Sequence, residues 1–176
     1  AVQRATVRIA PVDAAGRPVA GVEVLVRGPG GWIESVDLDE PRAAELSLPV
    51  GQTVTFRVLG SSVRAATGSL LVAPGEQRVQ VPMQPGFSAE LSTLSLRNFA
   101  GIAGLELIAD ERSCGFTDAT GELLIDLPAR PLRLSIDQAQ WRVIDGDTFD
   151  SDIAPDGTFE FGDHLGRLFL YALRVE

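Results

Sequence analysis

The chain has 176 residues, enough for one large domain or two small ones, and its hydrophobic fraction of 45% excludes wholesale disorder. Its 18 Gly and 11 Pro leave no stretch longer than 14 residues free of both, which excludes a helical bundle, a coiled coil and a transmembrane helix of about 20 residues. The net charge of −9 disfavours binding to nucleic acid or docking on an anionic membrane surface.

Apolar and polar residues alternate along most of the chain, which is the period of strands with one buried face. In chain order the alternation covers 7–9, 22–26, 46–48, 54–58, 79–83, 105–107, 123–127, 132–136, 141–143, 159–161 and 169–175. Turns rich in Gly and Pro separate these runs, so the sequence predicts an all-β sandwich fold. Only residues 42–46 and 166–174 admit a helical turn or two as an alternative.

The two halves of the sequence repeat one another. Four segments of the first half have counterparts in the second, in the same order: 18–24 (PVAGVEV) with 101–107 (GIAGLEL), 45–49 (ELSLP) with 124–128 (LIDLP), 54–58 (VTFRV) with 132–136 (LRLSI), and 72–75 (VAPG) with 153–157 (IAPDG). The spacing from Gly21 to Pro74 also matches that from Gly104 to Pro155. We therefore predict two copies of one small β domain, over 1–84 and 87–176, with a boundary near 82–86.

Turn and strand motifs in both halves resemble a known family. They are 16–24 (GRPVAGVEV) and 48–56 (LPVGQTVTF) in the first half, and 117–123 (TDATGEL) and 127–134 (LPARPLRL) in the second. On these residues the chain resembles the carboxypeptidase-regulatory-like domains, which are transthyretin-like sandwiches related in shape to the B-type repeats of collagen adhesins. The resemblance implies two tandem seven-stranded Ig/transthyretin-like β-sandwich domains, and it favours an extracytoplasmic or cell-surface location.

The sequence departs from the family pattern at two places. Residues 32–37 replace the usual TDxxG hairpin in the first half, and Arg130-Pro131 stands where a Gly is usual in the second. Related adhesin repeats carry isopeptide bonds between Lys and Asn, and this chain has no Lys with which to form one. The motifs that match are structural, so the resemblance bears on the fold rather than on an activity.

The negative charge is concentrated in the second half. Residues 1–86 hold eight acidic residues and eight Arg, whereas residues 87–176 hold sixteen acidic residues and seven Arg. The densest acidic stretch runs from 145 to 163 and includes Asp145, Asp147, Asp150 and Asp152. Three interpretations of this stretch stay open: a solvated acidic hairpin, a Ca²⁺ site built from these four carboxylates, or a docking surface for a basic protein partner.

Groups for catalysis are scarce. His164 is the single His, Cys114 is the single Cys, and no phosphate-binding loop is present. His164 lies in a loop between two glycines, a place more typical of a solvated surface residue than of the base in a serine or cysteine triad. One His and one Cys cannot build a tetrahedral zinc site without carboxylates. We therefore predict that the chain is not an enzyme and has no cofactor, with Ca²⁺ at the acidic stretch as the alternative that stays open. Trp32, next to a Gly-rich loop, is the candidate for a glycan-binding surface, whereas Trp141 lies in an alternating run typical of the core.

These features lead to one leading function and one alternative. The leading hypothesis is a non-enzymatic tandem β-sandwich module for protein–protein interaction or structural spacing within a larger assembly or multidomain protein. The alternative is a carbohydrate-binding or adhesive surface module, with or without calcium. The sequence specifies neither the partner nor an oligomeric state.

Overall fold

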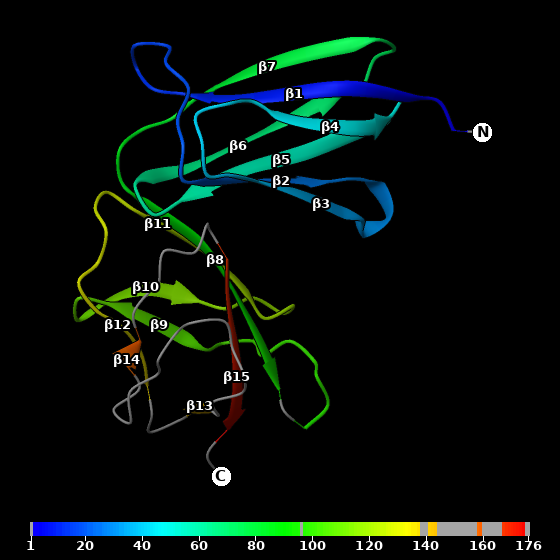
Figure 1. Ribbon diagram of the computed structural model, residues 1–176. Helices are drawn as coiled ribbons and strands as arrows, with labels where there is room; N and C mark the ends of the chain where they lie inside the picture. The colour runs from blue at the N-terminus through cyan, green and yellow to red at the C-terminus, as the bar shows by residue number, and fades with distance from the viewer. Residues whose placement is uncertain (1, 96, 138–140, 144–157, 160–166, 175–176) are drawn as a thin grey trace.

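The described part of the chain consists of β-strands, connecting segments and one short 3₁₀ turn (Figure 1). A computed structural model describes residues 2–95, 97–137, 141–143, 158–159 and 167–174, the last three ranges as strand backbone. The described part contains no α-helix, and a short 3₁₀ turn, Pro29–Gly31, joins two of the strands. The all-β prediction is therefore confirmed, and no described helix is long and apolar enough to cross a membrane.

Two sheets fold from the first half of the chain. Its strands are β1 (Arg4–Val12), β2 (Val22–Arg27), β3 (Ile33–Leu38), β4 (Ala44–Pro49), β5 (Thr53–Gly60), β6 (Val63–Leu71) and β7 (Glu76–Pro82). They form a three-stranded sheet of order β4-β1-β7 and a four-stranded sheet of order β3-β2-β5-β6. The inward side chains of both sheets, among them Val7, Val24, Leu48 and Val58, make one apolar core.

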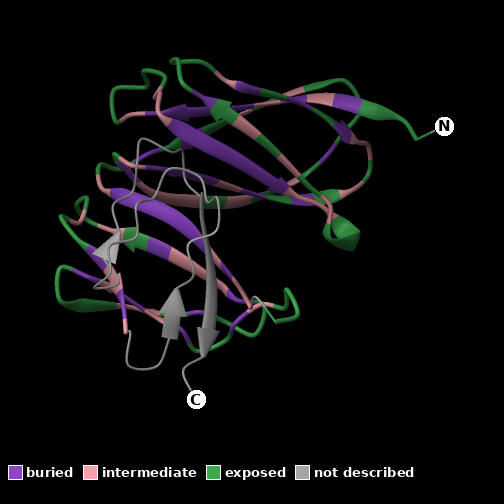
Figure 2. Ribbon diagram, turned by 60° about the horizontal axis from the view of Figure 1, so that its bottom comes forward, coloured by how far each residue is buried: buried purple, intermediate pink, exposed green. Residues whose placement is uncertain are grey.

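Two further sheets fold from the second half. Its strands are β8 (Phe87–Ser95), β9 (Glu106–Ala109), β10 (Arg112–Phe116), β11 (Glu122–Leu127), β12 (Leu134–Ile136), β13 (Trp141–Val143), β14 (Thr158–Phe159) and β15 (Arg167–Arg174). They form sheets of order β11-β8-β15-β13 and β10-β9-β12-β14, and a second apolar core contains Phe87, Leu91, Leu107 and Ile125. In Figure 2 the buried stretches lie along the strands of both halves, and exposed residues mark the turns.

Strand pairing follows the same pattern in both pairs of sheets. In the first half β1 pairs antiparallel with β4 and parallel with β7, and in the second half β8 pairs antiparallel with β11 and parallel with β15. The other two sheets also correspond. In the first half the order is β3-β2-β5-β6, and in the second half it is β10-β9-β12-β14, so β2 and β9 occupy equivalent places. The second half adds β13 beside β15.

Several details of the sequence prediction are wrong. The alternative of a helical turn fails at 42–46, which leads into β4, and at 166–174, which contains β15. Leu132 was expected inside a strand, but it precedes β12 and its side chain is 93% exposed. Strands β3, β6, β8 and β10 are absent from the predicted runs. In β6 small and polar residues, as in 65–69 (AATGS), hide the apolar period, and most of β8 is buried on both faces.

A tight turn between β10 and β11 depends on a glycine. Gly121 has a φ of +83°, and its N–H donates to the carbonyl of Asp118 at 3.0 Å. A Cβ at this position would lie 2.5 Å from the carbonyl oxygen of Thr93 and 2.7 Å from the amide nitrogen of Ile102. Both the backbone angle and the space therefore require glycine. The TDxxG motif predicts a hairpin here, but the turn joins β10 and β11, which belong to different sheets.

We predict that Gly121→Ala destabilises the protein more than Gly104→Ala. Gly104 has a similar φ of +76°, but no atom lies within 4 Å of its Cβ position, so this control isolates the cost of the backbone angle, about 1 kcal/mol. Gly121→Ala adds the steric overlap with the Thr93 carbonyl. Urea unfolding of the two variants measures the difference, and equal losses would contradict the close packing of this turn.

Candidate functional site

The most elaborate polar arrangement in the described structure lies where the two halves meet. We call this contact the joint; it is formed by strands β5 and β6 of the first half with β8 and β11 of the second, and Arg27 at the end of β2 also reaches it. Strand β8 has two faces with different roles. Phe87, Ala89 and Leu91 point into the second core, whereas Ser88 and Glu90 lie on the opposite face, toward the first half, and are also buried.

Ser88 fixes the start of β8 on the first half. Its Oγ donates to the carbonyl oxygen of Val63 at 2.8 Å and accepts the N–H of Gly60 at 3.1 Å. Nearby, the backbone of Arg64 donates to the carbonyl of Gln84, and that of Gly86 donates to the carbonyl of Ser62. The connection between the halves is therefore hydrogen-bonded to the end of the β5–β6 hairpin rather than free.

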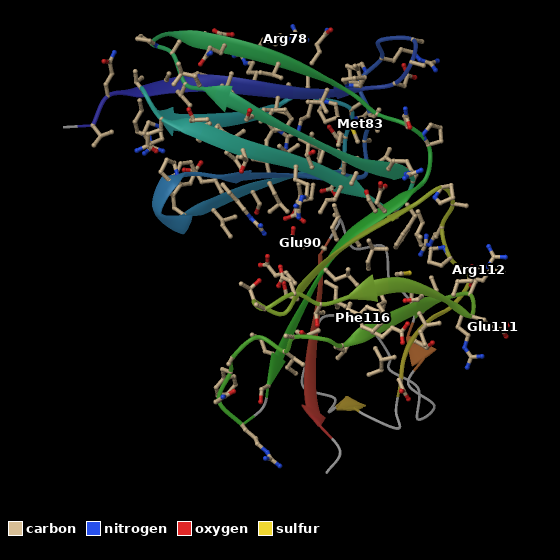
Figure 3. The ribbon with its side chains drawn as sticks, turned by 180° about the vertical axis from the view of Figure 1, so that it is seen from behind. Arg78, Met83, Glu90, Glu111, Arg112 and Phe116 are labelled. Atoms are coloured by element: carbon tan, nitrogen blue, oxygen red, sulfur yellow. The ribbon has the colours of Figure 1, made fainter. Side chains whose placement is uncertain are left out.

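Glu90 is the centre of the joint. Its side chain is only 4% exposed, and it accepts hydrogen bonds from two arginines of the first half: Arg27 Nη2 contacts Oε1 at 2.5 Å, and Arg57 Nη1 contacts Oε2. The two guanidinium groups are about one-third exposed. A carboxylate removed from water needs such partners, because an unpaired buried charge is strongly destabilising. Figure 3 shows Glu90 between the two pairs of sheets.

A second ion pair closes the joint at β11. Arg64 donates from Nε and Nη2 to the two carboxylate oxygens of Asp126 at 2.8 and 2.9 Å, and the Ala65 N–H donates to Asp126 Oδ1 at 3.0 Å. The hydrogen bonds from the Arg64 side chain and the Ala65 backbone, together with the Arg64 charge, lower the pKa of Asp126, although partial burial opposes them. This fork-like geometry gives an orientation as well as an attraction.

The positive and negative charges of the joint come from different halves of the chain. Arg27, Arg57 and Arg64 belong to the first half, whereas their partners Glu90, Glu122 and Asp126 belong to the second. Glu122 lies at the edge of this arrangement, with Oε2 at 3.7 Å from Arg27 Nη1. Part of the acidic excess of the second half is thus matched by arginines of the neutral first half.

None of the joint residues was singled out from the sequence. Each charged residue of the joint stands inside a strand, and its partner is 33 to 95 positions away, so local patterns give no sign of the pairing. The one available signal is the placement of Glu90 between Ala89 and Leu91 in a run otherwise free of charge, 87–96 (FSAELSTLSL). Because charged side chains are rarely buried without a partner, a lone acid in such a run indicates a paired carboxylate.

The structure places Trp32 against the first core. The residue follows the Pro29–Gly31 turn, is half-buried and packs on the core cluster. Its indole also lies over Gly28, where an added Cβ would come within 1.9 Å of Cε2. The ring therefore has a packing role in this loop, and its role in glycan binding stays a prediction.

The other candidate residues of the sequence lie mostly outside the described residues. This holds for Asp145, Asp147, Asp150 and Asp152, for His164, and for the side chain of Trp141. Within the described ranges, no group of three or more His, Cys, Asp or Glu side chains is arranged to hold a metal ion. Cys114 is a half-buried free thiol, and burial raises its pKa, which disfavours the reactive thiolate.

Comparison with known proteins gives structural similarities at low sequence identity. A double mutant of the shaft pilin SpaA from Lactobacillus rhamnosus GG matches over 100% of both chains, with 9% identity and a TM-score of 0.39. A C-terminal fragment of the pilus adhesin SpaC from the same organism matches 47% of this chain and 45% of its own, with 13% identity and a TM-score of 0.34. The Bacillus anthracis TIE protein matches 98% of this chain, with 14% identity and a TM-score of 0.33.

The chain spans about a third of the TIE protein and less than half of the SpaC fragment. No protein-family model matches the sequence. No curated protein matches it either. Similarities at this level assign the chain neither to a family nor to a function.

We predict that Glu90→Gln lowers the free energy of unfolding by about 2 kcal/mol, because two arginines lose their buried counter-charge. The matched control is Glu76→Gln in the β4-β1-β7 sheet. This substitution removes an exposed partner of Arg8 and should lower the free energy of unfolding by less than about 0.5 kcal/mol. Urea unfolding at neutral pH compares the two. Equal costs would show that the joint contributes no more than a surface ion pair.

The Asp126 ion pair predicts an acid-sensitive joint. Because its pKa is lower in the folded protein than in the unfolded chain, the ionised carboxylate stabilises the fold above the ordinary Asp pKa of about 3.9. That contribution is lost as the pH falls through the lower pKa of the folded state.

Asp126→Asn should therefore lower stability at neutral pH and flatten the loss of stability between about pH 5 and pH 2. The control is Asp39→Asn, since Asp39 is exposed and forms no ion pair with other described residues. Unfolding free energies measured across this pH range provide the test. An unchanged pH profile in Asp126→Asn would contradict the assignment.

Proposed function

We propose that the chain is a non-enzymatic module of two tandem β-sandwich domains, 1–84 and 87–176, that holds its ends at a fixed geometry within a larger assembly. The observation that carries this proposal is the buried Glu90 carboxylate, which is shared by Arg27 and Arg57 across the joint. A carboxylate at this depth ties one strand of the second half to two strands of the first. Such a contact suits a spacer whose halves keep one relative orientation.

The division into two domains is supported by the separate sheets and cores. In the described structure each of the four sheets draws its strands from one half only, and each core cluster likewise stays within one half. The matching order of strand pairing supports two copies of one domain, as the sequence repeat predicts. The connection is short, since β7 ends at Pro82 and β8 begins at Phe87.

Rigidity of the joint is supported by three kinds of contact. Leu25 and Leu59 are buried on the outer face of the β3-β2-β5-β6 sheet, although the first core lies on the other face. Backbone hydrogen bonds fix the connection, and the ion pairs of Glu90 and Asp126 set its direction. Apolar burial supplies attraction, and paired charges supply a specific orientation.

The resemblance to regulatory-like and adhesin domains favours an extracytoplasmic or cell-surface setting and a protein partner. A basic partner for the acidic second half, Ca²⁺ at 145–152 and a glycan at Trp32 remain predictions. The joint itself supports a spacer role within an assembly. Its contacts connect the two halves to each other, and they involve none of the residues predicted to bind those ligands.

The proposal predicts one narrow distance between the two halves in solution. Spin labels at Arg78→Cys and Glu111→Cys, in a Cys114→Ser background, report this distance by double electron–electron resonance. Both positions are exposed, one in each half (Figure 3). We expect a narrow distribution for the native joint, and a broader one when Glu90→Gln and Asp126→Asn are combined.

The same labels in a Glu76→Gln protein provide the control, since that substitution leaves the joint intact. A broad distribution in the native protein, left unchanged by the joint substitutions, would refute the rigid spacer.

A further inference from the structure

A pocket of about 430 Å³ opens beside the joint on the outer face of the β3-β2-β5-β6 sheet. The side chains that line it come from two neighbouring rows of residues on that face, and most of them are polar. One row runs Leu25–Arg57–Thr67 across β2, β5 and β6, and the next runs Arg27–Thr55–Ser69. Glu90 of β8 closes one side. Strand register thus places two guanidinium groups and three hydroxyl groups around one hollow.

Most hydrogen-bond donors of this pocket are unused within the described structure. Arg57 donates to Glu90 through Nη1 alone, so its Nε and Nη2 groups have no acceptor among the described residues. The hydroxyl groups of Thr67 and Ser69 likewise have no hydrogen bond to a described residue. Thr55 Oγ1 makes only a long contact of 3.5 Å to the carbonyl of Arg27. Both oxygens of the nearby acceptor, Glu90, already accept from arginine.

We propose that this pocket binds a carboxylate group, with Arg57 as its principal contact and the hydroxyls of Thr55, Thr67 and Ser69 around it. A site whose hydrogen-bond donors lack acceptors, and whose acceptor oxygens are already hydrogen-bonded, complements an anion rather than a cation. The flat Nε–Nη2 edge of a guanidinium matches the two oxygens of a carboxylate. Glu90 and Glu122 lie close by, so one carboxylate group, with a single charge at the point of contact, is repelled less than a phosphate group that carries up to two charges there.

The carboxylate comes from either of two sources, an acidic side chain of a protein partner or a free small acid. Both present the same planar group to Arg57. The pocket opens to solvent beside the joint, and its hydroxyl-bearing residues Thr55, Thr67 and Ser69 are exposed. The inference depends on the joint being closed as described, because Glu90 orients Arg57, but it does not depend on the spacer role.

Titration of the whole chain with glutarate and with a capped tetraglutamate peptide tests the site and separates the two sources. Amide shifts of residues 55, 57, 67 and 69 in ¹⁵N spectra locate the binding, and calorimetry gives its strength. We expect saturable binding of at least one of the two probes, in the millimolar range or tighter. Binding of glutarate alone assigns the site to a free acid, and stronger binding of the peptide assigns it to a partner.

Three variants make the test specific. Thr67→Val keeps the strand and every ion pair of the joint but removes one hydroxyl donor, and it should weaken binding about threefold. Arg57→Gln should weaken it at least about tenfold, because a charged hydrogen-bond donor is lost. Arg8→Gln, which removes an arginine from the β4-β1-β7 sheet of the first half, should leave binding unchanged.

Either of two results would overturn the carboxylate site. One is the absence of saturable shifts at these residues with both probes; the other is binding that Arg57→Gln and Thr67→Val leave unchanged. Tighter binding of inorganic phosphate than of glutarate would overturn the assignment of the ligand class. The spin-label distance in the Thr67→Val protein stays narrow if the joint is intact, so failure of the pocket is distinguishable from failure of the spacer.

Discussion

The structure depends on a single strand, β8, which has to satisfy two different neighbours at once. Its odd-numbered residues from Phe87 to Leu91 complete the apolar core of the second half, and its even-numbered residues meet the outer face of a sheet in the first half. A buried carboxylate on that second face is unstable without positive partners. The arginines of β2 and β5 meet this requirement, so the relative position of the two halves is set by chemistry as well as by shape.

The distribution of charge follows from the same constraint. The first half is neutral as a whole, yet it places Arg27, Arg57 and Arg64 on the side that meets the acidic second half. Two rows of the same sheet face carry hydroxyls beside Arg57, which gives the joint an open, donor-rich side. The contact between the two halves thereby also creates this polar pocket.

The sequence predicts much of the fold because a strand that is buried on one face shows alternating apolar and polar residues. Runs such as Val54, Phe56 and Val58 identify strands correctly, and the motif at 117–123 correctly marks a turn, in which Gly121 has a positive φ. The pattern fails where both faces are buried or where small polar residues fill a strand, as in β8 and β6. The joint could not be predicted, because its ion pairs connect residues far apart in the sequence and depend on the angle between the halves. The sequence drew attention instead to Trp32, whose ring packs on the first core.

Calorimetric unfolding of the intact chain is the most direct test of the central claim that the two halves form one unit. Coupling through β8 predicts a single transition in which the calorimetric and van't Hoff enthalpies agree. Two resolved transitions, one for each half, would contradict the claim, since each half would then unfold without regard to the buried contacts of Ser88 and Glu90.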